Sequence, residues 1–136
     1  MVKLVTKEIE EMFKKIGSQE NNPDPIVVVK FFNPSGPGTW FATELHYVLG
    51  TEGNGEKPEV VEIEASKMDD SLRSRVCDMM FYGYVSIHGD HCDEWGYFSL
   101  GELLTVKCPP FGLGIERDIW FESQPISKVC PKAIGG

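Results

Sequence analysis

The sequence has no hydrophobic run long enough to cross a membrane. A membrane-spanning helix requires about 20 consecutive apolar residues, and no apolar stretch of this chain approaches that length. Near the start, Lys3, Lys7 and Glu8 interrupt the apolar residues, so the uninterrupted apolar core of a secretory signal peptide is missing. We therefore expect a cytoplasmic protein with no membrane partner.

Paired cysteine motifs are missing, and basic residues are outnumbered by acidic ones. The cysteines form no C-x-x-C pair (Cys77, Cys92, Cys108 and Cys130), and without an export signal we expect reduced thiols rather than disulfides. The chain has 13 Lys and Arg against 21 Asp and Glu, a net charge of −8. Direct nucleic-acid binding is disfavoured, because phosphate neutralisation requires clustered Lys and Arg. The acidity fits docking onto a basic protein, and solubility alone explains it equally well.

Catalytic and cofactor motifs are also missing. Gly112-Leu113-Gly114 lacks the third glycine and the lysine of a phosphate-binding loop. No serine lies in a nucleophile-elbow sequence, and apart from Cys92 beside His91 the cysteines have no adjacent histidine, so a nucleophilic enzyme is not indicated. We expect no bound cofactor.

What is present is the pattern of one small α+β domain. Its 136 residues suit a single domain covering 1–136. Apolar residues recur at helical spacing from Ile9 to Ile16 and predict an amphipathic helix over about 6–16, with Thr6 as its N-cap and Gly17 at its end. Segments rich in β-branched and aromatic residues predict strands at 26–32, 39–49, 59–64, 79–87, 95–98 and 118–121.

Turn-forming residues at 33–38 and 88–93 predict hairpins. We therefore expect a mainly antiparallel sheet of about five or six strands, the N-terminal helix on one face and short connecting helices. Gly83 inside a strand indicates a bulge or close packing. Ser66 with Asp69, and Ser99 with Glu102, resemble capping boxes. Residues 122–136 are predicted to be a loosely held tail.

The densest cluster of candidate metal ligands is His88, His91 and Cys92, among acidic neighbours. Two imidazoles across a turn, completed by a thiolate or carboxylate, could hold zinc. A solvated hairpin tip rich in His and Asp is the alternative, and it is the one we favour, because no second set of ligands is paired with the cluster.

The triplet Glu116-Arg117-Asp118 also has two interpretations. A fixed guanidinium between carboxylates could orient a substrate, or one of the acids could act as a general base. The alternative is a structural clasp in which Arg117 is buried and pairs with a carboxylate such as Glu44 or Glu102, its stem packed on Trp120 or Phe98. We predict the clasp.

Acidic residues dominate the segment 44–64. Its glutamates could form one negative face that caps a basic groove of a partner (Glu44, Glu59, Glu62 and Glu64). The charge is modest for a mimic of DNA, so docking onto a protein is the preferred interpretation.

Five ordered blocks carry a resemblance to a known family: Asp24 to Pro34, Trp40 to Glu44, Phe81 to Val85, Gly96 to Leu100, and Gly112 to Asp118. Together they resemble the domain of unknown function family 2958, small bacterial proteins often encoded on plasmids, phages and integrative elements. The resemblance covers about Asp24 to Phe121, and the chain departs from the pattern between His46 and Asp78. It implies an accessory protein of a mobile element, and no catalytic residues come with it.

We therefore expect a non-enzymatic protein-binding accessory protein, acting as an inhibitor of a host nucleic-acid-handling or defence complex. Its partner would be a protein with a basic surface, and the chain itself a monomer or small homo-oligomer. The alternative is a small enzyme or metal-binding module that uses His88, His91 and Cys92, or Glu116 and Asp118.

Overall fold

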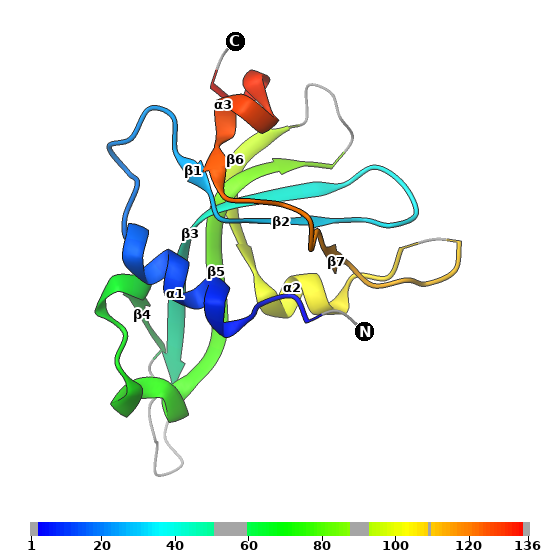
Figure 1. Ribbon diagram of the computed structural model, residues 1–136. Coiled ribbons are helices and arrows are strands. Elements are labelled where there is room, and N and C mark those ends of the chain that lie inside the picture. The colour runs from blue at the N-terminus through cyan, green and yellow to red at the C-terminus, as the bar shows by residue number, and fades with distance from the viewer. Residues whose placement is uncertain (1–2, 51–59, 88–92, 109, 135–136) are drawn as a thin grey trace.

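A computed structural model describes residues 3–50, 60–87, 93–108 and 110–134 (Figure 1). Its centre is a six-stranded antiparallel sheet in the order β6-β5-β3-β2-β7, with β4 paired to β3 outside that path. The strands are β2 (Val29–Phe32), β3 (Thr39–Gly50), β4 (Val60–Glu64), β5 (Val76–Ser86), β6 (Glu94–Ser99) and β7 (Glu116–Arg117). The predicted α+β class and antiparallel pairing are confirmed.

Helix α1 (Lys7–Ile16) has the predicted bounds and packs on one face of the sheet (Figure 1). The hydroxyl of Thr6 accepts a hydrogen bond from the Ile9 amide at 3.3 Å. Gly17 has φ +70° and donates its amide to the Phe13 carbonyl at 2.9 Å. A positive φ after the last turn favours glycine, so the predicted ends of this helix at Thr6 and Gly17 are both confirmed.

The main core lies between α1, α2 (Leu100–Thr105) and the inner face of the sheet. Phe81 is fully buried at its centre, 5.5 Å from Phe31, 5.4 Å from Phe98 and 6.0 Å from Phe13 between ring centroids. These tilted and stacked contacts suit aromatic quadrupoles and add to the area that the rings bury. The predicted cap of α2 is confirmed, because the Ser99 hydroxyl accepts from the Glu102 amide.

The predicted loose tail is wrong, because the C-terminal segment packs on the outer face of the sheet. Strand β8 (Gln124–Pro125) pairs with β1 (Ile26–Val27), and α3 (Ile126–Val129) and η3 (Pro131–Ile134) follow it. Ile126 is fully buried, and a second core joins it to Cys130, Ala133 and residues of β1, β3 and β5. Apolar residues three or four apart give this short helical segment one buried face.

Several other predictions also need correction. Segment 66–78 holds two 3₁₀ turns, η1 (Ala65–Lys67) and η2 (Asp70–Arg75), and the cap of η2 is Asp69, which accepts from the Ser71 amide at 2.8 Å, rather than Ser66. The strand expected at 118–121 is a turn after β7, because the Asp118 carboxylate accepts from the Trp120 amide. The strand expected at 26–32 is divided at Val28 between the two sheets.

A β-bulge at Thr43 divides β3 into two registers. Ala42 pairs with Gly83 of β5 and Glu44 pairs with Tyr82, so Thr43 is the extra residue. A Cβ on Gly83 would lie 1.8 Å from the Phe41 carbonyl oxygen, so no larger residue fits beside the bulge. Both features that Gly83 indicated in the sequence, a bulge and close packing, are present.

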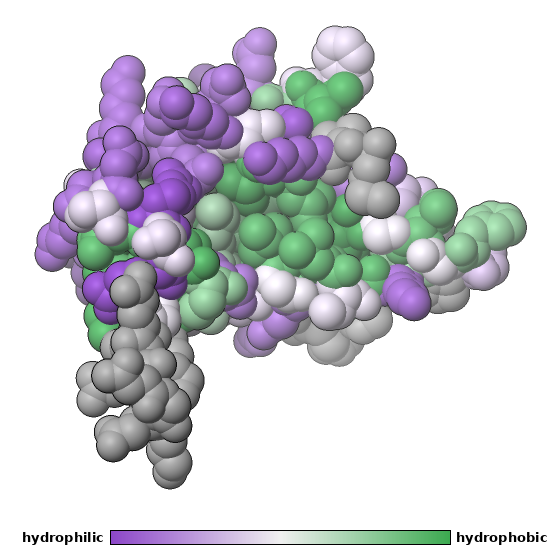
Figure 2. Space-filling view, turned by 90° about the horizontal axis from the view of Figure 1, so that it is seen from below, coloured by the Kyte–Doolittle hydropathy of each residue, from purple (hydrophilic) through white to green (hydrophobic). Residues whose placement is uncertain are grey.

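Part of the surface remains apolar. Figure 2 shows a broad hydrophobic area on the underside, flanked by hydrophilic residues. Many of the exposed large hydrophobic residues follow one another between α2 and the turn after β7: Leu104, Val106, Phe111, Leu113, Ile119 and Trp120. Among the described residues, no helix combines the length and apolar character that crossing a membrane requires.

The bulge predicts contrasting outcomes for two directly paired glycines. Gly83→Ala places a methyl group against the Phe41 backbone and should lower the free energy of unfolding by about 3 kcal/mol or more, at the upper end for single substitutions. Gly96 pairs with Gly83 but has open space at its Cβ position, so Gly96→Ala should change stability by less than about 0.5 kcal/mol. Urea unfolding of both variants tests this, and equal losses would contradict the close approach.

Candidate functional site

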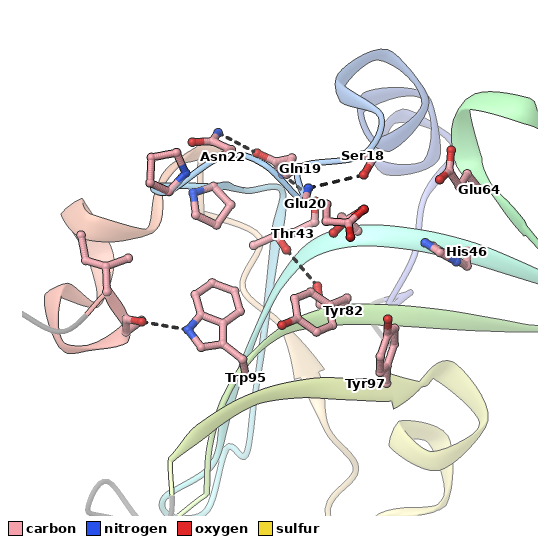
Figure 3. Close-up of a pocket in the computed structure, with 15 residues that line it drawn as sticks. Ser18, Gln19, Glu20, Asn22, Thr43, His46, Glu64, Tyr82, Trp95 and Tyr97 are labelled. Carbon is pink, nitrogen blue, oxygen red and sulfur yellow. Dashed lines mark hydrogen bonds between the residues drawn. The ribbon is translucent and has the colours of Figure 1, made fainter.

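The outer face of the sheet carries a cleft of about 540 Å³ beside the packed C-terminal segment. The loop after α1, strands β3 to β6 and η3 all contribute to its walls (Figure 3). Its volume lies within the range that accommodates small molecules or a few side chains of a partner. The lining residues are Ser18, Gln19, Glu20, Asn22, Pro23, Pro25, Thr43, Glu44, His46, Glu64, Tyr82, Trp95, Tyr97, Ala133 and Ile134.

One wall of the cleft is aromatic. Tyr82 of β5 stacks on Trp95 of β6 with centroids 5.9 Å apart and planes at 19°, and it meets Tyr97 edge-on at 4.9 Å. Cross-strand pairing explains the cluster, because Tyr82 is directly opposite Tyr97 and alternate residues share a face. Tyr97 remains 64% exposed, so this wall is open to solvent.

The other walls carry negative charge. Glu20 comes from the loop after α1, Glu44 from β3 and Glu64 from β4, and none of the described lining residues is Lys or Arg. Close to Glu64, His46 Nδ1 lies 3.8 Å from Glu62 Oε1. The cleft therefore combines an aromatic platform with carboxylates, which is the pairing that attracts organic cations.

Tyr82 does not supply a base at neutral pH. Burial raises the pKa of Tyr82 above its usual range, and the charges of Tyr97 and Glu44 raise it further. Burial likewise raises the pKa of Tyr84 and of the Cys130 thiol, next to the cleft in the second core. These groups stay protonated near pH 7, so they suit binding rather than nucleophilic chemistry.

Gln19 holds the loop that forms one rim of the cleft. It is 7% exposed, and its amide nitrogen donates to the Ile26 carbonyl at 2.8 Å and the Thr43 carbonyl at 2.7 Å. Its amide oxygen accepts from the Ile26 amide at 2.6 Å. Thr43 is the bulged residue, so this buried side chain links the rim loop to a backbone carbonyl at the bulge.

Replacing this amide by a carboxylate should therefore be costly. Gln19→Glu keeps the shape but faces two carbonyl oxygens without a donor, and we expect a loss of roughly 2 kcal/mol or more in unfolding free energy. The matched control is Gln124→Glu, because the Gln124 amide donates to the Glu122 carbonyl at an exposed position. Urea unfolding compares the two, and an unchanged midpoint for Gln19→Glu would contradict the role given to this side chain.

The structure brings part of the predicted acidic face together. Glu44 and Glu64 line the cleft, Glu62 lies beside it through His46, and Glu59 lies outside the described residues. The sequence reasoning missed Gln19 and the aromatic wall. The alternation of Trp95 and Tyr97 along one strand was a signal for a shared face, but their exposure depends on how the C-terminal segment packs.

A family model described as "Protein of unknown function (DUF2958)" matches residues 4–52 and 72–133. The chain belongs to this family. The match extends beyond the range 24–121 over which the resemblance was seen, and the unmatched residues between its two parts fall within the interval 46–78 where the sequence departs from the pattern. No curated protein and no solved structure matches the chain.

The predicted clasp differs from its expected form in this DUF2958 member. Arg117 is half-buried, and its Nε donates to the Lys3 carbonyl at 2.9 Å instead of to a carboxylate. Asp118 Oδ2 lies 3.7 Å from Lys30 Nζ, Glu116 is exposed, and Trp120 is 87% exposed. The triplet therefore lies at the sheet edge and does not contribute to the cleft.

The metal candidates His88, His91 and Cys92 lie outside the residues that the structure describes. Within the described part of the chain, no group of three or more His, Cys, Asp or Glu side chains is placed to hold a metal ion. The zinc hypothesis therefore stays a prediction from the sequence.

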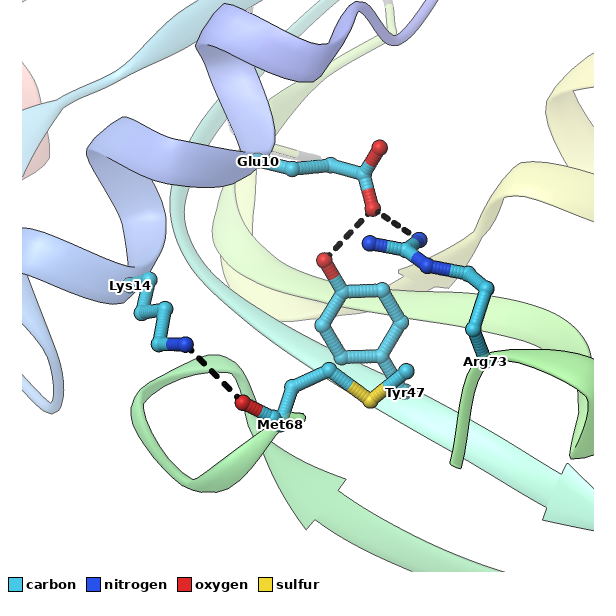
Figure 4. A network of polar contacts seen from close by, with 5 residues as sticks. All are labelled: Glu10, Lys14, Tyr47, Met68 and Arg73. Carbon is cyan, nitrogen blue, oxygen red and sulfur yellow. Dashed lines mark hydrogen bonds and ion pairs between the residues drawn. The ribbon is translucent and has the colours of Figure 1, made fainter. Parts of the chain in front are cut away.

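A second polar cluster lies on the opposite face of the sheet and joins α1, β3 and η2 (Figure 4). The Tyr47 hydroxyl and Arg73 Nη1 both donate to Glu10 Oε1, each at 2.6 Å. The Arg73 guanidinium also lies 5.6 Å from the centre of the Tyr47 ring. Burial raises the pKa of Tyr47 well above its usual range, and the Glu10 carboxylate raises it further. This cluster fastens the helix to the sheet.

The raised pKa of Tyr47 predicts a pH dependence of stability. A raised folded-state pKa means that Tyr47 stabilises the fold fully below its unfolded-state value of about 10, and that this contribution is lost as pH rises above it. We therefore expect Tyr47→Phe to be less stable than the native chain by about 1 kcal/mol near pH 8. The difference should shrink by about pH 11.

Urea unfolding of both proteins at the two pH values provides the measurement. Tyr97→Phe, which removes a phenol hydroxyl from an exposed ring, is the comparison variant. A constant difference for Tyr47→Phe would show that the phenol titrates alike in the folded and unfolded chain.

Proposed function

We propose that this protein is a non-enzymatic binding module whose outer-face cleft receives a basic segment of a partner protein. The supporting observation is the composition of the cleft, in which Glu20, Glu44 and Glu64 surround an aromatic wall without a described Lys or Arg. A positively charged side chain would gain attraction from the carboxylates and from the ring faces.

The net charge of the protein also favours a basic partner. With a net charge of −8, the molecule attracts basic partners at long range and repels nucleic acid. Charge complementarity of this kind raises association rates and selects against acidic partners. Glu44 and Glu64, with His46 between them along the sheet, support the acidic face predicted from the sequence as the surface that meets the partner.

The catalytic alternative receives less support. Glu116 and Asp118 lie at the edge strand, and Asp118 faces Lys30. Neither residue lines the cleft. The protonated Tyr82 supplies no base. An enzyme would need acid and base groups converging on one reacting position, and the described cleft carboxylates come from separate elements around an open aromatic surface.

The biological setting remains part of the proposal. Resemblance to plasmid- and phage-borne proteins favours a partner that handles nucleic acid, in a host defence complex that this protein inhibits. Such partners present basic surfaces to their substrates, so an acidic cleft can compete for the same surface. Blocking that surface requires no chemistry from the inhibitor.

Affinity capture from bacterial lysate tests this proposal. The native chain should retain basic or nucleic-acid-associated proteins, and Glu44→Gln with Glu64→Gln should reduce their recovery about tenfold or more, as expected when charge-assisted contacts are lost. Glu8→Gln with Glu122→Gln removes the same charge at exposed positions outside the cleft. Equal recovery with both double variants, or retention of no basic protein, would contradict the proposed function.

A further inference from the structure

The shape of the aromatic wall restricts which cation the cleft can select. Tyr82 and Trp95 are stacked against each other, and Tyr97 meets Tyr82 edge-on. Rings in direct contact leave no space for a cation between them. The wall is therefore a platform whose most exposed ring is Tyr97, at 64%, unlike the cages of separated rings that enclose methylated ammonium groups.

A platform of this kind suits a flat cation. A guanidinium is planar and stacks on an aromatic face, whereas a lysine ammonium is a compact, strongly hydrated point charge. The stacked group would keep its N–H edge free for other acceptors. Lysine could reach the same surface, but it would gain less from the ring and would lose more hydration.

The carboxylates of the cleft lie where the N–H edge of a stacked guanidinium would point. Glu44 is on the strand next to Tyr82 and directly opposite it in the register. Glu64 is directly opposite His46 on the next strand, and Glu20 faces the cleft from the loop above (Figure 3). Glu44 on β3 and Glu64 on β4 therefore lie on one side of the platform, where they can accept from the donors that a guanidinium carries along its edge.

We propose that the cleft is an arginine-binding site, selective for the guanidinium of an arginine in an exposed segment of the partner protein. The inference rests on the proposed function and adds the identity of the recognised side chain. The structure commits the site to a protein segment, because the cleft is open at the exposed Tyr97 and has room for neighbouring backbone as well as one side chain.

A titration with short peptides tests the inference on the full chain. The probes are acetylated, amidated Gly-Gly-Xaa-Gly-Gly peptides in which Xaa is arginine, lysine or citrulline, the neutral isostere of arginine. The reporter is the indole N–H of Trp95, which donates to the Ala133 carbonyl at the cleft. Trp40 is buried in the other core and Trp120 is exposed outside the cleft, so their indole signals serve as internal controls in the NMR spectrum.

We expect the arginine peptide to shift the Trp95 signal and leave the other two unchanged. It should bind about fivefold or more tightly than the lysine peptide, with no binding of the citrulline peptide. Glu44→Gln should weaken arginine binding about fivefold or more, and Glu8→Gln should not change it. Equal or tighter lysine binding, equal citrulline binding, or no shift of Trp95 with arginine would overturn the inference.

The two proposals fail in different ways. If cleft variants lose partner capture while the peptides show no preference for arginine, the binding function stands and the guanidinium selectivity is wrong. If the arginine peptide binds at Trp95 while capture is insensitive to Glu44 and Glu64, the arginine site stands and the proposed partner function is wrong.

Discussion

The bulge at Thr43 is the constraint on which the outer face of this molecule depends. A regular strand would place Glu44 on the same face as Trp40 and Ala42, which are in the main core. The extra residue reverses the alternation, so that Phe41 and Glu44 share the outer face and Leu45 returns to the core. A buried unpaired carboxylate would be strongly destabilising. The bulge moves this carboxylate into the cleft.

Two residues from elsewhere in the chain accommodate the bulge. Gly83 allows the Phe41 carbonyl to approach the neighbouring strand, and Gln19 satisfies the carbonyl of Thr43. The Thr43 hydroxyl donates to the Tyr82 carbonyl at 3.1 Å. Because Gln19 also binds both backbone groups of Ile26, the same side chain positions the rim loop and the start of β1. The buried side-chain amide of Gln19 thus connects the bulged strand β3, the start of β1 and the rim of the cleft.

The two faces of the sheet are covered differently. Four phenylalanines, α1 and α2 fill the inner face, and the Glu10–Tyr47–Arg73 cluster fastens α1 at its edge. On the outer face, the C-terminal segment covers Phe41 and Tyr84, and its Ala133 carbonyl accepts the indole N–H of Trp95. Tyr97, on the same strand as Trp95, stays open to solvent in the cleft that Glu44 and Glu64 also line. Incomplete coverage of one sheet face therefore creates the proposed binding surface.

The sequence by itself determined the local elements. Thr6, Gly17, Ser99 and the alternating apolar strands encode their caps and periodicities within a few residues, and local hydrogen bonds suffice to express them. It also indicated the acidic character of 44–64 and a bulge or close packing at Gly83.

The tertiary structure decided the arrangement of the cleft, because contacts between distant residues set it. Which face Glu44 joins depends on a bulge supported by Gln19, and whether Trp95 and Tyr97 are covered depends on where the C-terminal segment packs. The periodicity of the sequence predicts neither of these two features. Alternation along a strand indicates which residues share a face of the sheet, but it does not indicate which face is exposed to solvent.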